Sequence, residues 1–185
     1  MIHLLYTPFT GLGWHQGFRG DKWYHHRIEL FKEFTLLSLL NQTNKNFIHW
    51  ISFRPEEKYH QLTKELEDHL KSINYPYIFT FGGLCFWDDK YFNDNLLERL
   101  KATLPELKDT VGDNDYVLKT IVPSDDMYLK DAVELIQQQD YQNNEALTFH
   151  NGYVMKASTG EVAYWNPPPV NTPPFYKLIF PKDIF

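Results

Sequence analysis

The sequence predicts an α/β fold in which a mostly parallel sheet carries helices on both faces. Runs of β-branched and aromatic residues alternate four times with amphipathic stretches at helical spacing. At 185 residues and 43% hydrophobic content, the chain can form one domain with a substantial core. Ala146 to Lys156 and Val162 to Trp165 flank Ser158 to Gly160, a pattern typical of a β-hairpin. We therefore expect a single domain over residues 1–185 that ends in a Pro-rich tail, 166–185.

Three strands and two helices are predicted in the first half of the chain. The strands are Ile2 to Tyr6, Phe47 to Phe53 and Tyr77 to Phe81. A helix with a wide apolar face is predicted from Arg27 to Asn41, after a long loop from Gly11 to His26 of the kind that often binds ligands. The second helix begins near Pro55, and its apolar residues recur at helical spacing: Tyr59, Leu62, Leu66 and Leu70.

An acidic pair lies in the second half, after the most regular strand pattern. A helix is predicted from Asn93 to Pro105, followed by a polar turn from Asp109 to Asp115. The next strand, Val117 to Val122, precedes apolar residues at helical spacing, namely Leu129, Val133 and Ile136. Between the strand and this helix lie Ser124, Asp125 and Asp126. In open α/β sheets, ligands bind at that end of the strands.

Charge and composition narrow the classes of partner. A net charge of −6 argues against a nucleic-acid interface, which needs clustered Lys and Arg, but leaves room for a small anionic ligand. The lone cysteine, Cys85, cannot form an intramolecular disulfide and favours a reducing compartment, so we expect a cytoplasmic location. We also expect no transmembrane segment, because no apolar run is long enough to cross a bilayer. Oligomeric state is not encoded in any visible pattern.

Four segments carry a resemblance to a known family. Arg27 to Thr43 and Asn46 to Ile51 resemble the first helix and second strand of glycosyltransferases with the A-type nucleotide-sugar fold, in particular the rhamnosyltransferase group. Thr120 to Asp126 is similar to the acidic metal and nucleotide-sugar motif of that group, and Asn151 to Val154 is also similar. The resemblance implies a Rossmann-like fold and an enzyme that moves a hexosyl or rhamnosyl group from a nucleoside-diphosphate sugar to a glycan or other hydroxyl acceptor.

Two departures from the family pattern bear on function. Ile121 and Pro123 stand where the group usually has an arginine and a leading aspartate, so the Asp-x-Asp arrangement is incomplete. The chain also stops soon after the hairpin, whereas full-length members continue into an acceptor-binding half that carries the usual catalytic base. The chain could therefore be a minimal enzyme, a shortened one, or a nucleotide-sugar-binding domain that lacks its acceptor-binding part.

The chemistry of sugar transfer explains why such a site uses carboxylates. Negative charge develops on the departing diphosphate, and a hard cation such as Mn²⁺ or Mg²⁺, bound by one or two carboxylates, stabilises it. On this interpretation Asp126 is the metal ligand, and Asp125 binds sugar hydroxyls or a metal-bound water. Both count as the candidate catalytic and metal-binding residues. Ser124 is expected to bind ribose.

The remaining candidate residues would bind the nucleotide. The end of the first strand is expected to form the nucleoside slot, with Thr7, Pro8 and Phe9. Guanidinium groups suit diphosphate oxygens because they offer two parallel N–H donors. The candidates for that role are Arg19, Arg27 and Arg54.

Each signal also has a plainer reading. Asp125 and Asp126 could simply cap the following helix, and the three arginines could pair with surface carboxylates. Pro123, Ile121 and the early end of the chain support a second hypothesis, a catalytically inactive nucleotide- or glycan-binding module on the same fold. A metal-dependent phosphohydrolase or nuclease is a third, although the net charge of −6 disfavours a nuclease.

Overall fold

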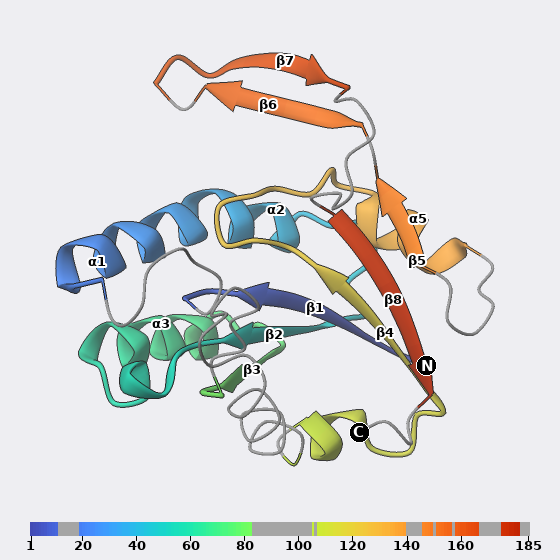
Figure 1. The fold of residues 1–185 in the computed structure, drawn as a ribbon, viewed down its shortest axis with the longest axis horizontal. Helices are drawn as coiled ribbons and strands as arrows, with labels where there is room; N and C mark the ends of the chain where they lie inside the picture. The colour runs from blue at the N-terminus through green and yellow to red at the C-terminus, as the bar shows by residue number, and fades with distance from the viewer. Residues whose placement is uncertain are drawn as a thin grey trace, which may run out of the picture.

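A six-stranded sheet forms the centre of the molecule. The computed structural model describes residues 1–10, 19–82, 105, 107–139, 146–149, 151–156, 158–166 and 175–181. Four parallel strands are β1 (Ile2–Pro8), β2 (Ile48–Ser52), β3 (Tyr77–Thr80) and β4 (Tyr116–Ile121). Two more, β8 (Phe175–Pro181) and β5 (Ala146–Phe149), complete the order β3-β2-β1-β4-β8-β5, with β8 antiparallel to both neighbours (Figure 1). The predicted α/β class with a mostly parallel sheet is confirmed.

The first helical stretch is longer than predicted. It begins at Asp21 and runs through α1 (Asp21–Leu30), the π-helix η1 (Phe31–Leu36) and α2 (Leu37–Leu40). The prediction that residues 21–26 belong to a loop is wrong, because Gly20 adopts φ +90° and ends the irregular backbone there. The part of the predicted loop at 11–18 lies outside the described residues.

The second helix starts later than predicted. Pro55 begins a single 3-10 turn, η2 (Pro55–Glu57), and α3 (Gln61–Ser72) follows after a break. His60 caps α3 by accepting a hydrogen bond from the Leu62 amide at 3.2 Å. Tyr59 therefore lies before the helix and is 90% exposed, so its assignment to the buried face is wrong.

The sheet has an apolar layer on each face. On one face, α1, η1 and α3 contribute Ile28, Phe31, Leu66 and Leu70, which pack against Leu5, Ile51 and Val122. On the other face, helical residues 107–111 contribute Leu107 and Val111, which pack against Leu4, Tyr6, Trp50, Val117 and Ile121. The helix predicted from Asn93 lies mostly outside the described residues, and the polar turn expected from Asp109 begins only at Gly112.

The segment after β4 is a loop rather than the start of a helix. Residues 122–131 precede α5 (Ala132–Gln138), whose Val133 and Ile136 are buried as predicted. Leu129 lies in the loop and is 63% exposed, so its placement on the helix is wrong. Asp125 and Asp126 lie several residues before α5, which excludes the interpretation that they cap it.

The C-terminal part divides between the sheet and a separate hairpin. The hairpin is formed by β6 (Gly152–Lys156) and β7 (Glu161–Trp165), joined at the predicted turn, and it stands apart from the large sheet in Figure 1. Ala146–Phe149 was expected in its first arm, but this segment is β5 of the large sheet. The tail supplies β8, while prolines 167–169, 173 and 174 lie outside the described residues. Among described residues, no helix is long and apolar enough to cross a bilayer.

The strand order creates a switch point beside β1. The chain passes from β1 through α1 to β2 on one side, and β4 pairs with β1 on the other side. Because the connection after β1 leads to β2 on one side and the connection after β3 leads to β4 on the other, the carboxyl ends of β1 and β4 form the kind of switch point at which α/β proteins bind ligands. The acidic pair follows β4 directly at this edge.

Candidate functional site

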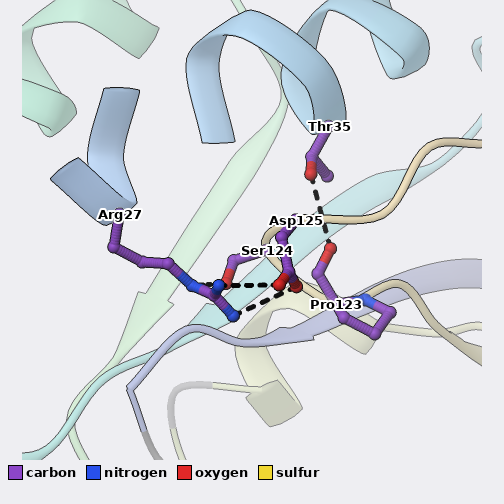
Figure 2. Close-up of polar contacts among 5 residues, drawn as sticks. All are labelled: Arg27, Thr35, Pro123, Ser124 and Asp125. Atoms are coloured by element: carbon purple, nitrogen blue, oxygen red, sulfur yellow. Dashed lines mark hydrogen bonds and ion pairs between the residues drawn. The ribbon is translucent and has the colours of Figure 1, made fainter. Parts of the chain in front are cut away.

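Arg27 links the first helix to the loop after β4. Its Nε donates to Ser124 Oγ at 2.7 Å, while Nη1 and Nη2 donate to Asp125 Oδ2 and Oδ1 at 2.7 and 3.0 Å. Figure 2 shows the guanidinium of Arg27 reaching from α1 to both side chains. A two-point contact with a carboxylate adds both energy and geometric specificity to a charge-assisted hydrogen bond. Ser124 is almost fully buried here and acts as an acceptor that orients Arg27, and its predicted contact with ribose stays a prediction.

The loop after β4 is anchored on the helix that carries Arg27. Thr35 Oγ1, in the π-helix, donates to the carbonyl of Pro123 at 3.4 Å (Figure 2). The Tyr128 amide donates to Ser38 Oγ at 3.2 Å, and Gln42 Nε2 donates to the Leu129 carbonyl at 2.9 Å. The loop therefore has a defined path although it contains no helix. π-helical turns are rare and occur frequently next to functional sites.

Asp126 differs from Asp125 in its surroundings. Its carboxylate accepts no hydrogen bond from a described side chain or amide, and it is half-buried. Burial and the neighbouring negative charge of Asp125 raise the pKa of Asp126, and Arg27 opposes this shift. Two adjacent aspartates thus play different parts: Asp125 neutralises Arg27, while Asp126 keeps its oxygens available.

The three predicted arginines come together at this edge. The Arg19 guanidinium lies over the ring of Trp23 at 4.5 Å, and that of Arg27 lies 5.9 Å from the same ring. Burial, followed by the positive charges of Arg54 and Arg27, lowers the pKa of Arg19. The Arg54 Nε donates to the Thr10 carbonyl at 3.0 Å, which places Arg54 at the same edge, beside the end of β1. Three guanidinium groups at one edge, of which Asp125 neutralises one, supply N–H donors suited to an anion.

Glu57 is a buried carboxylate that sequence reasoning missed. It is 2% exposed, and its Oε2 accepts hydrogen bonds from Thr10 Oγ1 and from the Arg54 amide, the latter at 3.0 Å. The Arg54 Nε donates to the Thr10 carbonyl at 3.0 Å. The available signal was the spacing of Glu57 three residues after Arg54, typical of an acidic residue in a capping box.

The end of β1 lies in the core beneath the edge. Thr7, Pro8 and Phe9 are buried, and the Thr7 hydroxyl donates to the Val122 carbonyl at 2.6 Å. The same hydroxyl lies 2.7 Å from His49 Nε2. In this position Thr7 supports the loop after β4, and the nucleoside slot predicted for Thr7, Pro8 and Phe9 stays a prediction.

His49 continues this contact into the core. Its Nδ1 lies 3.0 Å from Tyr75 Oη, and burial lowers the pKa of His49 to about 3. Because Thr7 donates its only hydroxyl proton to Val122, the neutral His49 donates from Nε2 and accepts from Tyr75 at Nδ1. This chain of hydrogen bonds joins β2, β1 and the segment after β4 just below the site.

The acidic pair leaves one of its two carboxylates available to a cation. Within the described ranges, no cluster of three or more His, Cys, Asp or Glu side chains gathers. Asp126 offers carboxylate oxygens of the kind that Mg²⁺ and Mn²⁺ prefer. Both oxygens of Asp125 accept from Arg27, whose positive charge repels a cation at that position. The donor set fits a hard cation bound by Asp126 alone, with the other ligands supplied by phosphate oxygens and water.

The structure thus places six of the nine predicted site residues at one edge of the sheet: Arg19, Arg27, Arg54, Ser124, Asp125 and Asp126. Trp23, Thr10 and Glu57 join them, while the other three, at the end of β1, lie beneath. Comparisons of the chain with models of protein families, with curated protein sequences and with solved structures found no match.

Proposed function

We propose that this chain is a glycosyltransferase domain that binds a nucleoside-diphosphate sugar and transfers its sugar to a glycan or another hydroxyl acceptor. The supporting observation is the group of three arginines beside an aspartate pair at the switch point of the sheet. In a protein with a net charge of −6, this concentration of guanidinium groups suits a small ligand with adjacent negative charges. From the resemblance to the A-type nucleotide-sugar fold, and to rhamnosyltransferases, we infer that this anionic ligand is the diphosphate of a nucleotide sugar.

Arg27 is the residue that this proposal places nearest to the diphosphate. A guanidinium has five N–H donors, and Arg27 uses three of them on Ser124 and Asp125. Two donors remain for a ligand, and the bidentate contact with Asp125 fixes their direction before binding. This preorganisation lowers the entropy cost of binding. Arg19 and Arg54 add positive charge at the same place.

The reaction needs charge stabilisation at the leaving group. As the bond from the anomeric carbon to the diphosphate breaks, negative charge grows on the phosphate oxygens, and fixed donors aimed at them lower the barrier. Asp126 would hold Mn²⁺ or Mg²⁺, which supplies further positive charge to the leaving group when bound. Arg27, held by Asp125, contributes the same effect from the protein itself.

A ligand-induced shift in melting temperature tests the binding step. At a ligand concentration of about 100 Kd, binding stabilises the folded state by about 2.7 kcal/mol. We therefore expect uridine or thymidine diphosphate, with MnCl₂, to raise the melting temperature by about 5 to 10 °C. Arg19→Gln should reduce the shift, whereas Lys64→Gln, which removes an exposed cation on α3, should not. The absence of a shift with every nucleoside diphosphate, with or without metal, would contradict the proposal.

A product-release assay tests the chemical step. Incubation with a panel of nucleotide sugars and acceptors should release nucleoside diphosphate. Asp126→Asn should lower this rate by about 100-fold or more, because it removes the proposed cation ligand. Asp131→Asn removes an exposed carboxylate just before α5 and serves as the matched control. Equal rates for the two variants would reject the role of Asp126.

One observation favours a second candidate, a nucleotide- or glycan-binding module without turnover. Both oxygens of Asp125 are engaged by Arg27, and Pro123 stands where the family has its leading aspartate. Such a site retains its three arginines for an anion, but only Asp126 of the acidic pair remains for a cation. Binding of nucleoside diphosphate without release of product from any nucleotide sugar would select this candidate.

A further inference from the structure

We propose that Glu57 is a positioning residue that fixes Arg54 at the edge of the sheet by tying together the segments after β1 and β2. The consequence for ligand binding rests on the proposed function, in which Arg54 contacts a diphosphate. The positioning of Arg54 itself does not, because it concerns contacts within the protein.

The contacts around Glu57 form a closed set. Glu57 Oε2 accepts from Thr10 Oγ1, which belongs to the segment after β1, and from the Arg54 amide, which belongs to the segment after β2. The Arg54 amide also lies 3.2 Å from Thr10 Oγ1, and the Arg54 Nε donates to the Thr10 carbonyl at 3.0 Å. One carboxylate oxygen therefore links two strand ends, and the side chain of Arg54 is held in the same network.

A capping role alone does not account for this arrangement. Glu57 occupies the third position of η2, where an acidic side chain commonly accepts from the backbone amide before the turn. That role explains its bond to the Arg54 amide. It does not explain the bond to Thr10, which lies 47 positions earlier in the chain on a different strand end. The link between strands is the additional feature.

The buried position of the Glu57 carboxylate lowers the stability of the fold. Burial raises the pKa of Glu57, and the hydrogen bonds from Thr10 and the Arg54 amide only partly oppose that shift. A buried charge destabilises a protein unless partners compensate it. An apolar side chain would be cheaper for the fold alone. The positive charge of Arg54, however, also lowers the pKa of Glu57, so the two residues compensate part of that cost together.

The backbone of Glu57 has a separate anchor that provides a control. Thr63 Oγ1 donates to the Glu57 carbonyl at 2.8 Å, and Tyr24 Oη lies 2.7 Å from the same Thr63 oxygen. These bonds hold η2 on α1 and α3 without involving the Glu57 carboxylate. Thr63→Val therefore removes the backbone anchor of Glu57 and leaves its carboxylate contacts in place, whereas Glu57→Ala removes the specific link to Arg54.

Hydrogen exchange of the Arg54 Nε–H, followed by ¹⁵N NMR on the whole chain without ligand, tests the positioning. We expect Glu57→Ala to accelerate this exchange at least tenfold, and Glu57→Gln, which keeps one accepting oxygen, to restore protection. Thr10→Val should resemble Glu57→Ala, because it cuts the same link and leaves the carboxylate in place. If Glu57→Ala does not fold, the Thr10→Val variant still provides the test. Thr63→Val should leave the exchange within about threefold of the wild type.

The outcomes separate this inference from the proposed function. Protection of the Arg54 Nε–H that survives both Glu57→Ala and Thr10→Val overturns the positioning role, as does an equal loss in Thr63→Val. Affinity for uridine diphosphate, measured by calorimetry, is the second readout. We expect Glu57→Ala to weaken it about tenfold and Glu57→Gln by less than threefold. If the wild type binds no nucleoside diphosphate but the exchange pattern holds, the proposed function fails and the positioning role stands.

Discussion

Arg27 and Asp125, which are 98 positions apart in the chain, form a two-point ion pair that joins α1 to the loop after β4. Ser124 extends this contact by accepting from the Arg27 Nε. Because of this pair, Asp125, one of the two aspartates expected to bind a cation, is occupied by Arg27. The pair also fixes the direction of the Arg27 guanidinium. The site therefore depends on a contact between side chains of opposite charge as much as on the acidic pair itself.

The strength of this pair can be measured with a double-mutant cycle. The variants Arg27→Ala, Asp125→Ala and the double variant should give a coupling free energy of about 1 kcal/mol at low salt, near the upper end for partly exposed pairs. The side chain of Asp125 is 47% exposed, so solvent screening limits the value. The coupling should shrink in 1 M NaCl. Chemical denaturation provides each free energy of unfolding, and a coupling below about 0.3 kcal/mol would show that the contact contributes little.

His49 should make stability depend on pH in the acidic range. Burial lowers its pKa from 6.5 to about 3, so between these pH values His49 is protonated in the unfolded chain and neutral in the folded protein. The contribution of neutral His49 is fully present above pH 6.5 and is lost as pH falls towards 3, at up to about 1.4 kcal/mol per pH unit. His49→Gln should lower stability at pH 7 by about 1 to 3 kcal/mol, because the bonds to Thr7 and Tyr75 change.

The same substitution should flatten the dependence of unfolding free energy on pH between 6.5 and 3. Urea denaturation at several pH values measures the slope for both proteins. Parallel curves for the wild type and His49→Gln would mean that His49 is not the group responsible.

Lys119 should destabilise the protein at neutral pH. Its ammonium lies over the rings of Tyr6 at 4.4 Å and Trp50 at 5.5 Å, and burial lowers its pKa from 10.5 to about 8. A lowered lysine pKa means that stability is greatest above pH 10.5 and is lost as pH falls through 8. Lys119→Met should therefore raise the free energy of unfolding at pH 7 by about 1 kcal/mol, after the loss of the cation–π contacts is deducted.

The gain from Lys119→Met should shrink as the pH is raised from 8 to 10. Lys64→Met removes an exposed lysine from α3 and should show no such trend. Thermal unfolding followed by circular dichroism at pH 7, 8, 9 and 10 gives both comparisons. A destabilised Lys119→Met protein at pH 7 would show that the ring contacts outweigh the cost of burial.

The turn of the hairpin should require a glycine. Gly160 has φ +71° and donates its amide to the Lys156 carbonyl at 2.8 Å, while an added Cβ would meet no atom within 4 Å. Gly160→Ala should thus cost about 1 kcal/mol through backbone strain alone. Gly152→Ala, in the same hairpin without a positive φ, is the matched control. Amide exchange in β6 and β7 should quicken about fivefold for the first variant and stay unchanged for the second.

Local sequence patterns were sufficient to predict those helices and strands that bury one face in the core. The four parallel strands were predicted because their apolar runs lie between turn residues, and Val133 and Ile136 were placed correctly on α5. The errors fall at element ends. Tyr59 and Leu129 match the helical period but lie outside the helices, since His60 and the loop of residues 122–131 set the true starts.

Strand pairing was harder to predict than strand formation. Ala146–Phe149 lies close in sequence to the hairpin, yet it pairs with β8 in the large sheet. The apolar tail that contains β8 pairs with both β4 and β5. Alternation of side chains along a strand says which face is buried, but it does not say which other strand supplies the neighbouring backbone.

By itself, the sequence determined the α/β class, the approximate strands and the kinds of side chain at their carboxyl ends, because these follow from local periodicity and turn chemistry. Only the tertiary structure decided that Arg27 pairs with Asp125, that Arg19 and Arg54 converge beside it, and that Glu57 is buried between two strand ends. The physical reason is that these contacts depend on the order β2-β1-β4 in the sheet, which brings together residues far apart in the chain and which no local pattern encodes.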